Sequence, residues 1–171
     1  MGAQQKEHAC RIGVLTLSDK GARGERTDES GPLLQELVAP VGVVARYQVI
    51  ADEYRHIVAV LKSWVDDLHL DLILTTGGTG MSPRDCTPQA TASLLDYEIP
   101  GMAEAMRSAG LRVTPHAMLS RALVGVRQQT LIINLPGSPK AARENFEVLL
   151  PVLPHALAKL QGDPSDCAVS P

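Results

Sequence analysis

The chain has 171 residues, of which 44% are hydrophobic and 20% are charged, and its formal net charge is −3. This length and apolar content predict one domain with a buried core, and the interspersed charges, with no basic block, argue against nucleic acid as the main partner. No apolar stretch approaches the roughly 18 residues of a membrane span and the first residues hold no apolar signal core, so we expect a cytoplasmic protein without membrane contact.

Strand-like runs alternate with helical patterns along the chain. We predict strands at 11–18, 43–50, 71–76 and 130–135, where β-branched and aliphatic residues dominate. Apolar residues on one stripe predict helices at 53–68 and at 140–160. The capping residue types Asp28 and Ser30 indicate a further helix at 31–39. Pro151 and Pro154 should kink or interrupt the last helix, and a further helix should start with Thr87 as its N-cap.

This order predicts an α/β fold of three layers, with a mostly parallel sheet covered by helices on both faces. Residues 10–160 should form the single domain, flanked by a flexible N-terminus at 1–9 and a flexible C-terminal tail at 161–171. Three widely spaced cysteines, Cys10, Cys86 and Cys167, indicate neither a disulfide framework nor a zinc site.

Function is expected in the loops that follow the strands, because ligands of open α/β sheets bind beyond the carboxyl ends of the strands. The first loop begins with Ser18 and Asp19, and the last contains the sequence PGSPKA from Pro136. The loop after the third strand is glycine-rich, with Gly77, Gly78 and Gly80. Such backbone suits phosphate oxygens, although a plain strand-to-helix turn is the alternative and no standard P-loop or dinucleotide fingerprint is present.

Asp52 and Asp85 follow the second and third strands. Carboxylates next to phosphates would be compatible with Mg²⁺ between them, but each aspartate could instead cap a helix or a turn, and the residues alone favour capping. Ser138 is expected to donate its hydroxyl to an anion, and Cys86 to be a passive packing residue.

Four motifs in order resemble one family. VLTLSD from Val14, TDESGP from Thr27, TTGGTG with SPRDCTPQAT from Thr75, and INLPGSPKA from Ile133 are similar to molybdopterin adenylyltransferases of the MogA and MoaB type, the fold of which recurs in gephyrin. The resemblance covers about residues 10–160. It implies a Rossmann-like topology and transfer of AMP from ATP to the terminal phosphate of molybdopterin, with Mg²⁺ required and pyrophosphate released.

The resemblance also implies site roles that override the capping alternative. Asp52 and Asp85 become the catalytic, metal-holding residues; the substrate-binding residues are Ser18, Asp19, Gly77, Gly78, Thr79, Gly80, Ser120, Pro136, Gly137 and Ser138. The family is typically trimeric, so a homotrimer and hand-over to a molybdenum insertase are expected. A non-catalytic molybdopterin carrier is the alternative function, and a nucleotide-binding regulator is a third.

Overall fold

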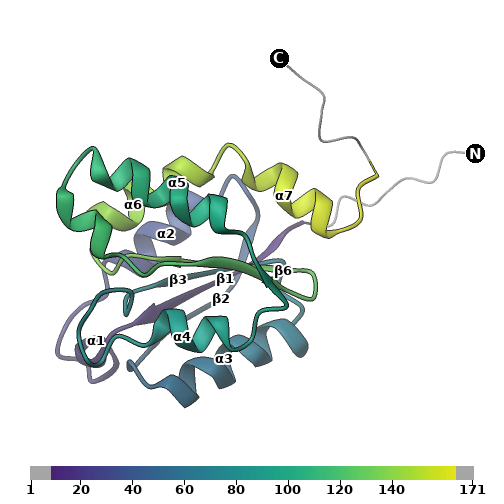
Figure 1. Ribbon diagram of the computed structural model, residues 1–171. Coiled ribbons are helices and arrows are strands. Elements are labelled where there is room, and N and C mark those ends of the chain that lie inside the picture. Colours follow the sequence, from purple (N-terminus) through teal and green to yellow (C-terminus); the bar gives the residue numbers. More distant parts are fainter. Residues whose placement is uncertain (1–8, 165–171) are drawn as a thin grey trace, which may run out of the picture.

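The computed structural model describes residues 9–164, which form a layered α/β domain (Figure 1). The expected flexible N-terminus falls almost wholly, and the C-terminal tail mostly, outside the described residues, as does Cys167. The described part contains no helix long and apolar enough to cross a membrane.

A six-stranded sheet in the order β2-β1-β3-β6-β5-β4 forms the central layer. The strands β1 (Arg11–Leu17), β2 (Val43–Ile50), β3 (Leu72–Thr76) and β6 (Thr130–Leu135) are parallel to one another. The other two, β5 (Val124–Arg127) and β4 (Tyr97–Glu98), add antiparallel pairs at one edge. The predicted mostly parallel sheet is therefore confirmed, and so are its four parallel strands.

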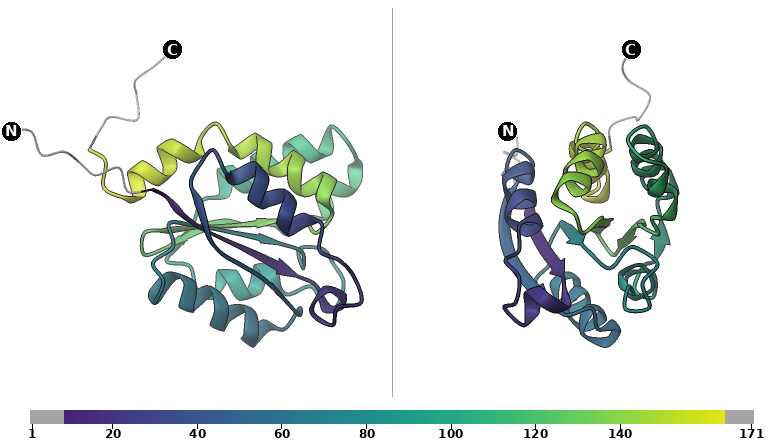
Figure 2. Two further views of the ribbon diagram at one scale, coloured as in Figure 1. Left: turned by 180° about the vertical axis from the view of Figure 1, so that it is seen from behind. Right: turned by 90° about the vertical axis from the view of Figure 1, so that its left-hand side faces the viewer.

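Helices cover both faces of this sheet, as Figure 2 shows from behind and from the side. One face carries α2 (Ser30–Val38), α5 (Pro100–Leu111), α6 (Pro139–Leu149) and α7 (Leu153–Leu160), and its core centres on the fully buried Phe146. The other face carries α3 (Tyr54–Asp66) and α4 (Thr87–Ala92), with Trp64 and Leu61 in a second core. Alternate residues of β1 point into the two cores, as the two-residue period of a strand requires.

The ends of the helices test the predicted caps. The helix after residue 139 breaks between α6 and α7 at Pro151, as predicted. Thr87 was wrongly predicted as an N-cap: it lies inside α4, and Cys86 holds the cap position without a side-chain hydrogen bond. Asp28 does accept hydrogen bonds at the start of α2, from the backbone N–H groups of Ser30 and Gly31 at 3.1 Å each. It therefore satisfies two of the free donors of that helix end.

Three elements were not predicted from the sequence: α5 and the antiparallel strands β4 and β5. Two further short helices also escaped prediction, α1 (Asp19–Ala22) after β1 and the 3-10 helix η1 (Pro115–Leu119) after α5. The hairpin between β5 and β6 turns through Gln128, whose φ of 54° is positive. Glutamine is not a typical turn residue, so this hairpin carries no Asn-Gly or Asp-Gly signal.

A bidentate ion pair ties α3 to this hairpin. Arg127 donates from Nε and Nη2 to the two carboxylate oxygens of Asp66, at 2.9 Å each. The hydrogen bonds from Arg127 hold the pKa of Asp66 below its usual value. The side chains of Arg127 and Asp66 are 20% and 23% exposed, so the ion pair remains in contact with water.

We expect Asp66→Asn to lower the melting temperature slightly at pH 7, by an amount that shrinks in acid. Because the folded-state pKa is lowered, the stabilisation is complete above the unfolded-state pKa of about 4 and is lost as the pH falls through the lower folded value. Thermal unfolding of both proteins at pH 7 and pH 3 measures this. A gap between the two melting temperatures that does not narrow at pH 3 would contradict the assignment.

Candidate active site

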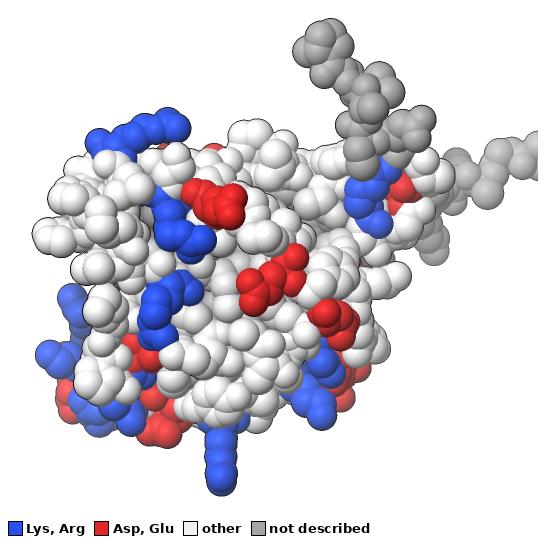
Figure 3. Space-filling view, viewed as in Figure 1, with Lys and Arg blue, Asp and Glu red and all other residues white. Residues whose placement is uncertain are grey.

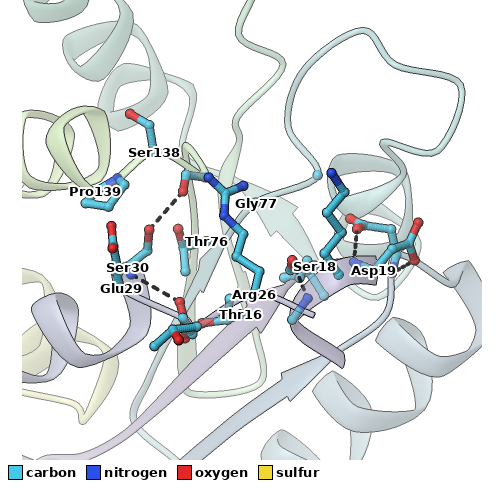
Figure 4. A pocket seen from close by; sticks show the side chains of 18 of the residues that line it. Thr16, Ser18, Asp19, Arg26, Glu29, Ser30, Thr76, Gly77, Ser138 and Pro139 are labelled. Carbon is cyan, nitrogen blue, oxygen red and sulfur yellow. Dashed lines mark hydrogen bonds between the residues drawn. The ribbon is translucent and has the colours of Figure 1, made fainter. Parts of the chain in front are cut away.

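A pocket of about 420 Å³ lies at the carboxyl ends of β1 and β3 (Figure 4). This volume is in the range of small-molecule sites. The pocket brings together eight residues that the sequence predicted for the site: Ser18, Asp19, Asp52, Gly77, Gly78, Asp85, Gly137 and Ser138. They come from four separate loops, so the fold assembles them as the topology of the sheet leads one to expect.

Two glycines shape the floor of this pocket. Gly77 has φ of 103° and Gly78 has φ of 65°, both in the region that favours glycine. A Cβ added at Gly77 would collide with the carbonyl oxygen of Leu17, and one at Gly78 would collide with the hydroxyl of Thr87. Glycine is therefore required at both positions by the backbone conformation and by close contacts within the protein, and both residues line the pocket.

Asp52 lies next to Gly78, and one of its two carboxylate oxygens has no hydrogen-bond partner within the described residues. Its Oδ2 accepts a hydrogen bond from the Asp19 N–H at 3.2 Å, while Oδ1 is buried and has no hydrogen-bond partner among residues 9–164. Burial, followed by the charge of Asp19, raises the pKa of Asp52. The N-cap of α3 is Glu53, so Asp52 does not cap that helix. An unpaired buried carboxylate oxygen is costly, which points to a bound partner.

An arginine from the glycine-rich loop neutralises the neighbouring acids. Arg84 donates to both carboxylate oxygens of Asp19, at 2.9 and 3.0 Å, and to Glu53 at 3.0 Å. Hydrogen bonds from Arg84 are the main cause that lowers the pKa of Asp19. Figure 3 shows acidic and basic side chains together at the corner of the molecule where α1 lies in Figure 1. Asp19 is thus held ionised, and it closes the reciprocal pair with Asp52 by accepting from the Asp52 N–H at 3.1 Å.

Asp85 combines a structural contact with an open position in the pocket. Its Oδ2 accepts from the Ser82 N–H at 2.9 Å, so the predicted turn contact is present. A Cβ added at Gly80 would lie 2.9 Å from the same oxygen, which shows how closely the loop backbone passes the carboxylate. No hydrogen bond to Asp85 Oδ1 is made within the described chain, and Asp85 lines the pocket together with Asp52.

These carboxylates fit one divalent cation shared with a ligand. Asp52 offers a buried oxygen without a partner, and Asp85 faces the same pocket. Residues 9–164 contain no cluster of three or more His, Cys, Asp or Glu suited to hold a metal alone. Mg²⁺ typically uses one or two carboxylates and completes its shell with phosphate oxygens and water. The donor set therefore fits Mg²⁺ when a phosphate ligand supplies the remaining oxygens.

The third wall of the pocket is the start of α6. The Ser138 hydroxyl accepts from the Ala141 N–H at 3.1 Å and so caps the helix, an acceptor role that the sequence did not predict. Ser30 donates to the Gly137 carbonyl at 2.8 Å and joins α2 to this loop. Cys86 packs against the α3-side core, and burial raises its thiol pKa, in agreement with the predicted passive role.

Four predicted site residues are not among those that line the pocket. They are Thr79, Gly80, Ser120 and Pro136. The Pro136 carbonyl accepts from the Thr76 hydroxyl at 2.7 Å, and the Ser120 hydroxyl accepts from the Ala122 N–H at 3.3 Å. The sequence missed Arg26 and Asp28 as pocket residues, although both lie in the long polar loop after β1 that it had singled out.

Arg121 fixes the loop that carries Asp85. Its guanidinium donates to the carbonyls of Gly80 and Asp85, at 2.7 Å each, and its backbone N–H donates to the Thr79 carbonyl at 3.0 Å. These three bonds join the chain beside Ser120 to both ends of the segment 79–85. Arg121 is therefore a positioning residue for the loop.

We expect Arg121→Met to speed amide hydrogen exchange in the segment 79–86. Losing two hydrogen bonds from a charged donor should raise the opening rate on the order of 10- to 100-fold. Arg107→Met is the matched control, because the Arg107 guanidinium donates to the Ala122 carbonyl at 2.8 Å, outside the segment 79–86. Equal exchange rates in the two variants would show that Arg121 does not hold the loop.

Comparison with known proteins agrees with this geometry. The family described as "Probable molybdopterin binding domain" matches residues 13–155. The chain belongs to this family. The chain is 43% identical to gephyrin from Dictyostelium discoideum. The matched region covers 94% of this chain but only 24% of gephyrin, so the chain spans about a quarter of that relative. It is also 39% identical to the molybdopterin adenylyltransferase of Helicobacter pylori J99, with 89% of this chain and 88% of the relative covered.

A solved structure extends the agreement to the fold. The molybdopterin biosynthesis enzyme MoaB from Thermus thermophilus superposes with a TM-score of 0.84 at 56% sequence identity, over 91% of this chain and 99% of that one. The α/β fold of this chain is therefore the one seen in that relative.

Proposed function

We propose that this protein is a molybdopterin adenylyltransferase in molybdenum cofactor biosynthesis. It transfers AMP from ATP to the terminal phosphate of molybdopterin and releases pyrophosphate. Membership of the family and the relative named for this activity support the proposal. The structural observation that carries it is one pocket in which glycine-rich backbone lies beside Asp52 and Asp85.

The reaction needs positioning and charge control rather than a covalent intermediate. An oxygen of the pterin phosphate attacks the α-phosphorus of ATP, and the bond from that phosphorus to the bridging oxygen of pyrophosphate breaks. Cys86 is not a suitable nucleophile, because burial raises its pKa and keeps the thiol protonated. The phosphate groups of the two substrates would be oriented by Ser18, Gly77, Gly78, Gly137 and Ser138.

Asp52 and Asp85 are the proposed magnesium ligands. The unpaired Asp52 Oδ1 supports this role most directly, since it is buried and unsatisfied without a cation. When bound, Mg²⁺ would neutralise charge on the ATP phosphates. Asp19 is already paired with Arg84, so it would keep Asp52 in place through the two reciprocal backbone contacts. Substrate contacts by Thr79, Gly80, Ser120 and Pro136 stay predictions.

A homotrimer is part of the proposal. Apolar side chains are exposed at the end of α5 and around η1, including Val113 at 53%, Met118 at 63% and Leu119 at 48%. Such a group of apolar side chains is typical of a surface that another protein covers. Sedimentation equilibrium should give about three times the chain mass of 18.3 kDa.

The proposed setting is the cytoplasm, with the adenylylated pterin passing to a molybdenum insertase.

Transfer of label tests the reaction itself. ATP labelled at the α-phosphate should yield labelled adenylylated molybdopterin, identified by mass spectrometry, when pterin and Mg²⁺ are present. A carrier would instead bind the pterin without consuming ATP. Tight pterin binding with no labelled product would therefore contradict the adenylyltransferase proposal and favour the carrier function.

A further inference from the structure

Arg26 brings an uncompensated positive charge into the candidate active site. It lines the pocket, and it makes no hydrogen bond or ion pair within residues 9–164. The arginines nearest to it in the loop and in the site are both paired, Arg23 with Glu25 at 2.7 Å and Arg84 with Asp19 at 2.9 Å. Figure 4 shows an extended Arg26 side chain whose guanidinium points into the pocket.

The groups on the same side of the pocket favour an anion. Gly77, Ser138 and Pro139 line it together with Arg26, and Ser138 and Pro139 form the start of α6, a helix of 11 residues. The N-terminal end of a helix carries partial positive charge. In Figure 4 Ser138 and Pro139 lie on the side of the pocket away from Asp19, and Glu29 lies below them on that side. Asp28 also lines the pocket, but it accepts hydrogen bonds from Thr16 and Tyr47, so neither of these acids is paired with Arg26.

The chemistry of arginine narrows the ligand further. Its planar, permanently charged guanidinium forms two parallel hydrogen bonds with a phosphate group, which a lysine ammonium cannot do. Lys20 also lines the pocket, but its ammonium is a point charge without the planar geometry that matches two phosphate oxygens. Among the basic side chains that line the pocket, Arg26 is therefore the one that can bind a phosphate through two parallel hydrogen bonds.

We propose that Arg26 binds a substrate phosphate that the aspartates do not hold, on the α6 side of the pocket. The proposal rests on the proposed function only for the identity of that ligand. The phosphate is either one from ATP or the terminal phosphate of molybdopterin, because both present the same chemistry to the guanidinium. Arg26 would then help to set the position of one substrate against the other.

The test uses Arg26→Gln with two companion variants. Arg23→Gln is the matched control, because it removes the same charge from the same loop at a residue that does not line the pocket. Arg26→Lys keeps the charge but loses the planar guanidinium, so it should keep only part of the phosphate affinity of the parent. Arg26 has no partner to lose within the described residues, so the variants should keep the parent melting temperature.

Binding of inorganic pyrophosphate by calorimetry, without Mg²⁺, probes the phosphate subsite directly. We expect Arg26→Gln to weaken it by about 10- to 100-fold, and Arg23→Gln to leave it within about twofold of the parent. Steady-state KM values then show which substrate carries the phosphate that Arg26 binds. A higher KM for ATP alone assigns a phosphate of ATP, and a higher KM for molybdopterin alone assigns the pterin phosphate. Pyrophosphate binding and both KM values unchanged in a folded Arg26→Gln would overturn the proposal.

The outcome is separable from that of the proposed function. If the parent transfers AMP and Arg26→Gln behaves like the parent, the Arg26 subsite is wrong and the adenylyltransferase stands. If the parent shows no transfer but Arg26→Gln still loses pyrophosphate binding, the subsite stands and the activity is wrong.

Discussion

Asp52→Asn should reduce AMP transfer by at least about 100-fold without destabilising the fold. The loss follows from removing the charge of a proposed metal ligand, the Oδ1 of which has no other partner among residues 9–164. The fold should tolerate the change, because burial raises the Asp52 pKa and a neutral amide removes that cost. The amide oxygen can still accept from the Asp19 N–H.

Initial rates and melting temperatures of the same preparations measure both effects. We expect the melting temperature of Asp52→Asn to equal or exceed that of the parent, as is common when a residue kept for function is replaced. Asp67→Asn is the control, since Asp67 lies at the other end of α3 and outside the pocket. Transfer rates within a few-fold of the parent in Asp52→Asn would rule out the assigned role.

Phe146→Ala should have the largest effect on stability, about 3–5 kcal/mol in the free energy of unfolding. Phe146 is the only phenylalanine and is fully buried, on the face of α6 that packs against the sheet. Its removal leaves a cavity in a core from which α6 cannot easily shift, because Ser30 also holds the α6 loop through the Gly137 carbonyl.

Urea unfolding followed by fluorescence measures this effect. Trp64 is the only tryptophan, and it lies in the core on the opposite face of the sheet, so its signal reports loss of the whole fold. Val148→Ala on the same helix is the control, because Val148 is 37% exposed and should cost far less. A loss below about 1 kcal/mol in Phe146→Ala would mean that the core repacks around the gap.

The parallel strands could be predicted because their sequences leave little choice. β3 and β6 are buried along their whole length and consist of aliphatic residues and threonine, apart from Asn134, which is typical of a sheet covered on both faces. The edge strand β2 was found from β-branched residues, although most of its side chains are exposed or half-buried. The break between α6 and α7 followed from Pro151.

The antiparallel edge could not be predicted in the same way. β5 has only four residues, and its turn to β6 passes through Gln128 rather than an Asn-Gly or Gly pair. Tertiary contacts stabilise that turn, because the Gln128 N–H donates to Asp96 at 2.6 Å across 32 residues of sequence. A contact over such a separation has no local signal in the chain.

In the site too, the features with a local sequence signal were predicted and the long-range contacts were not. Its glycines and aspartates were predicted by their motifs and by their places after strands. Their ordering contacts were not predicted: Arg84 reaches Asp19 across 65 positions, and Arg121 reaches Gly80 across 41. Thr87 shows what local sequence cannot predict. Its sequence context is typical of an N-cap, but in the structure it lies in α4 and its buried hydroxyl has no hydrogen-bond partner within the described residues.

Pyrophosphate release from ATP tests the central claim most directly. The purified protein should release pyrophosphate only when molybdopterin and Mg²⁺ are both present, and EDTA should stop the release. This result would account together for the glycine-rich loop that lines the pocket and for the unpaired oxygen of Asp52. Release without pterin, or no release from a folded protein that binds the pterin, would contradict adenylyl transfer by this site.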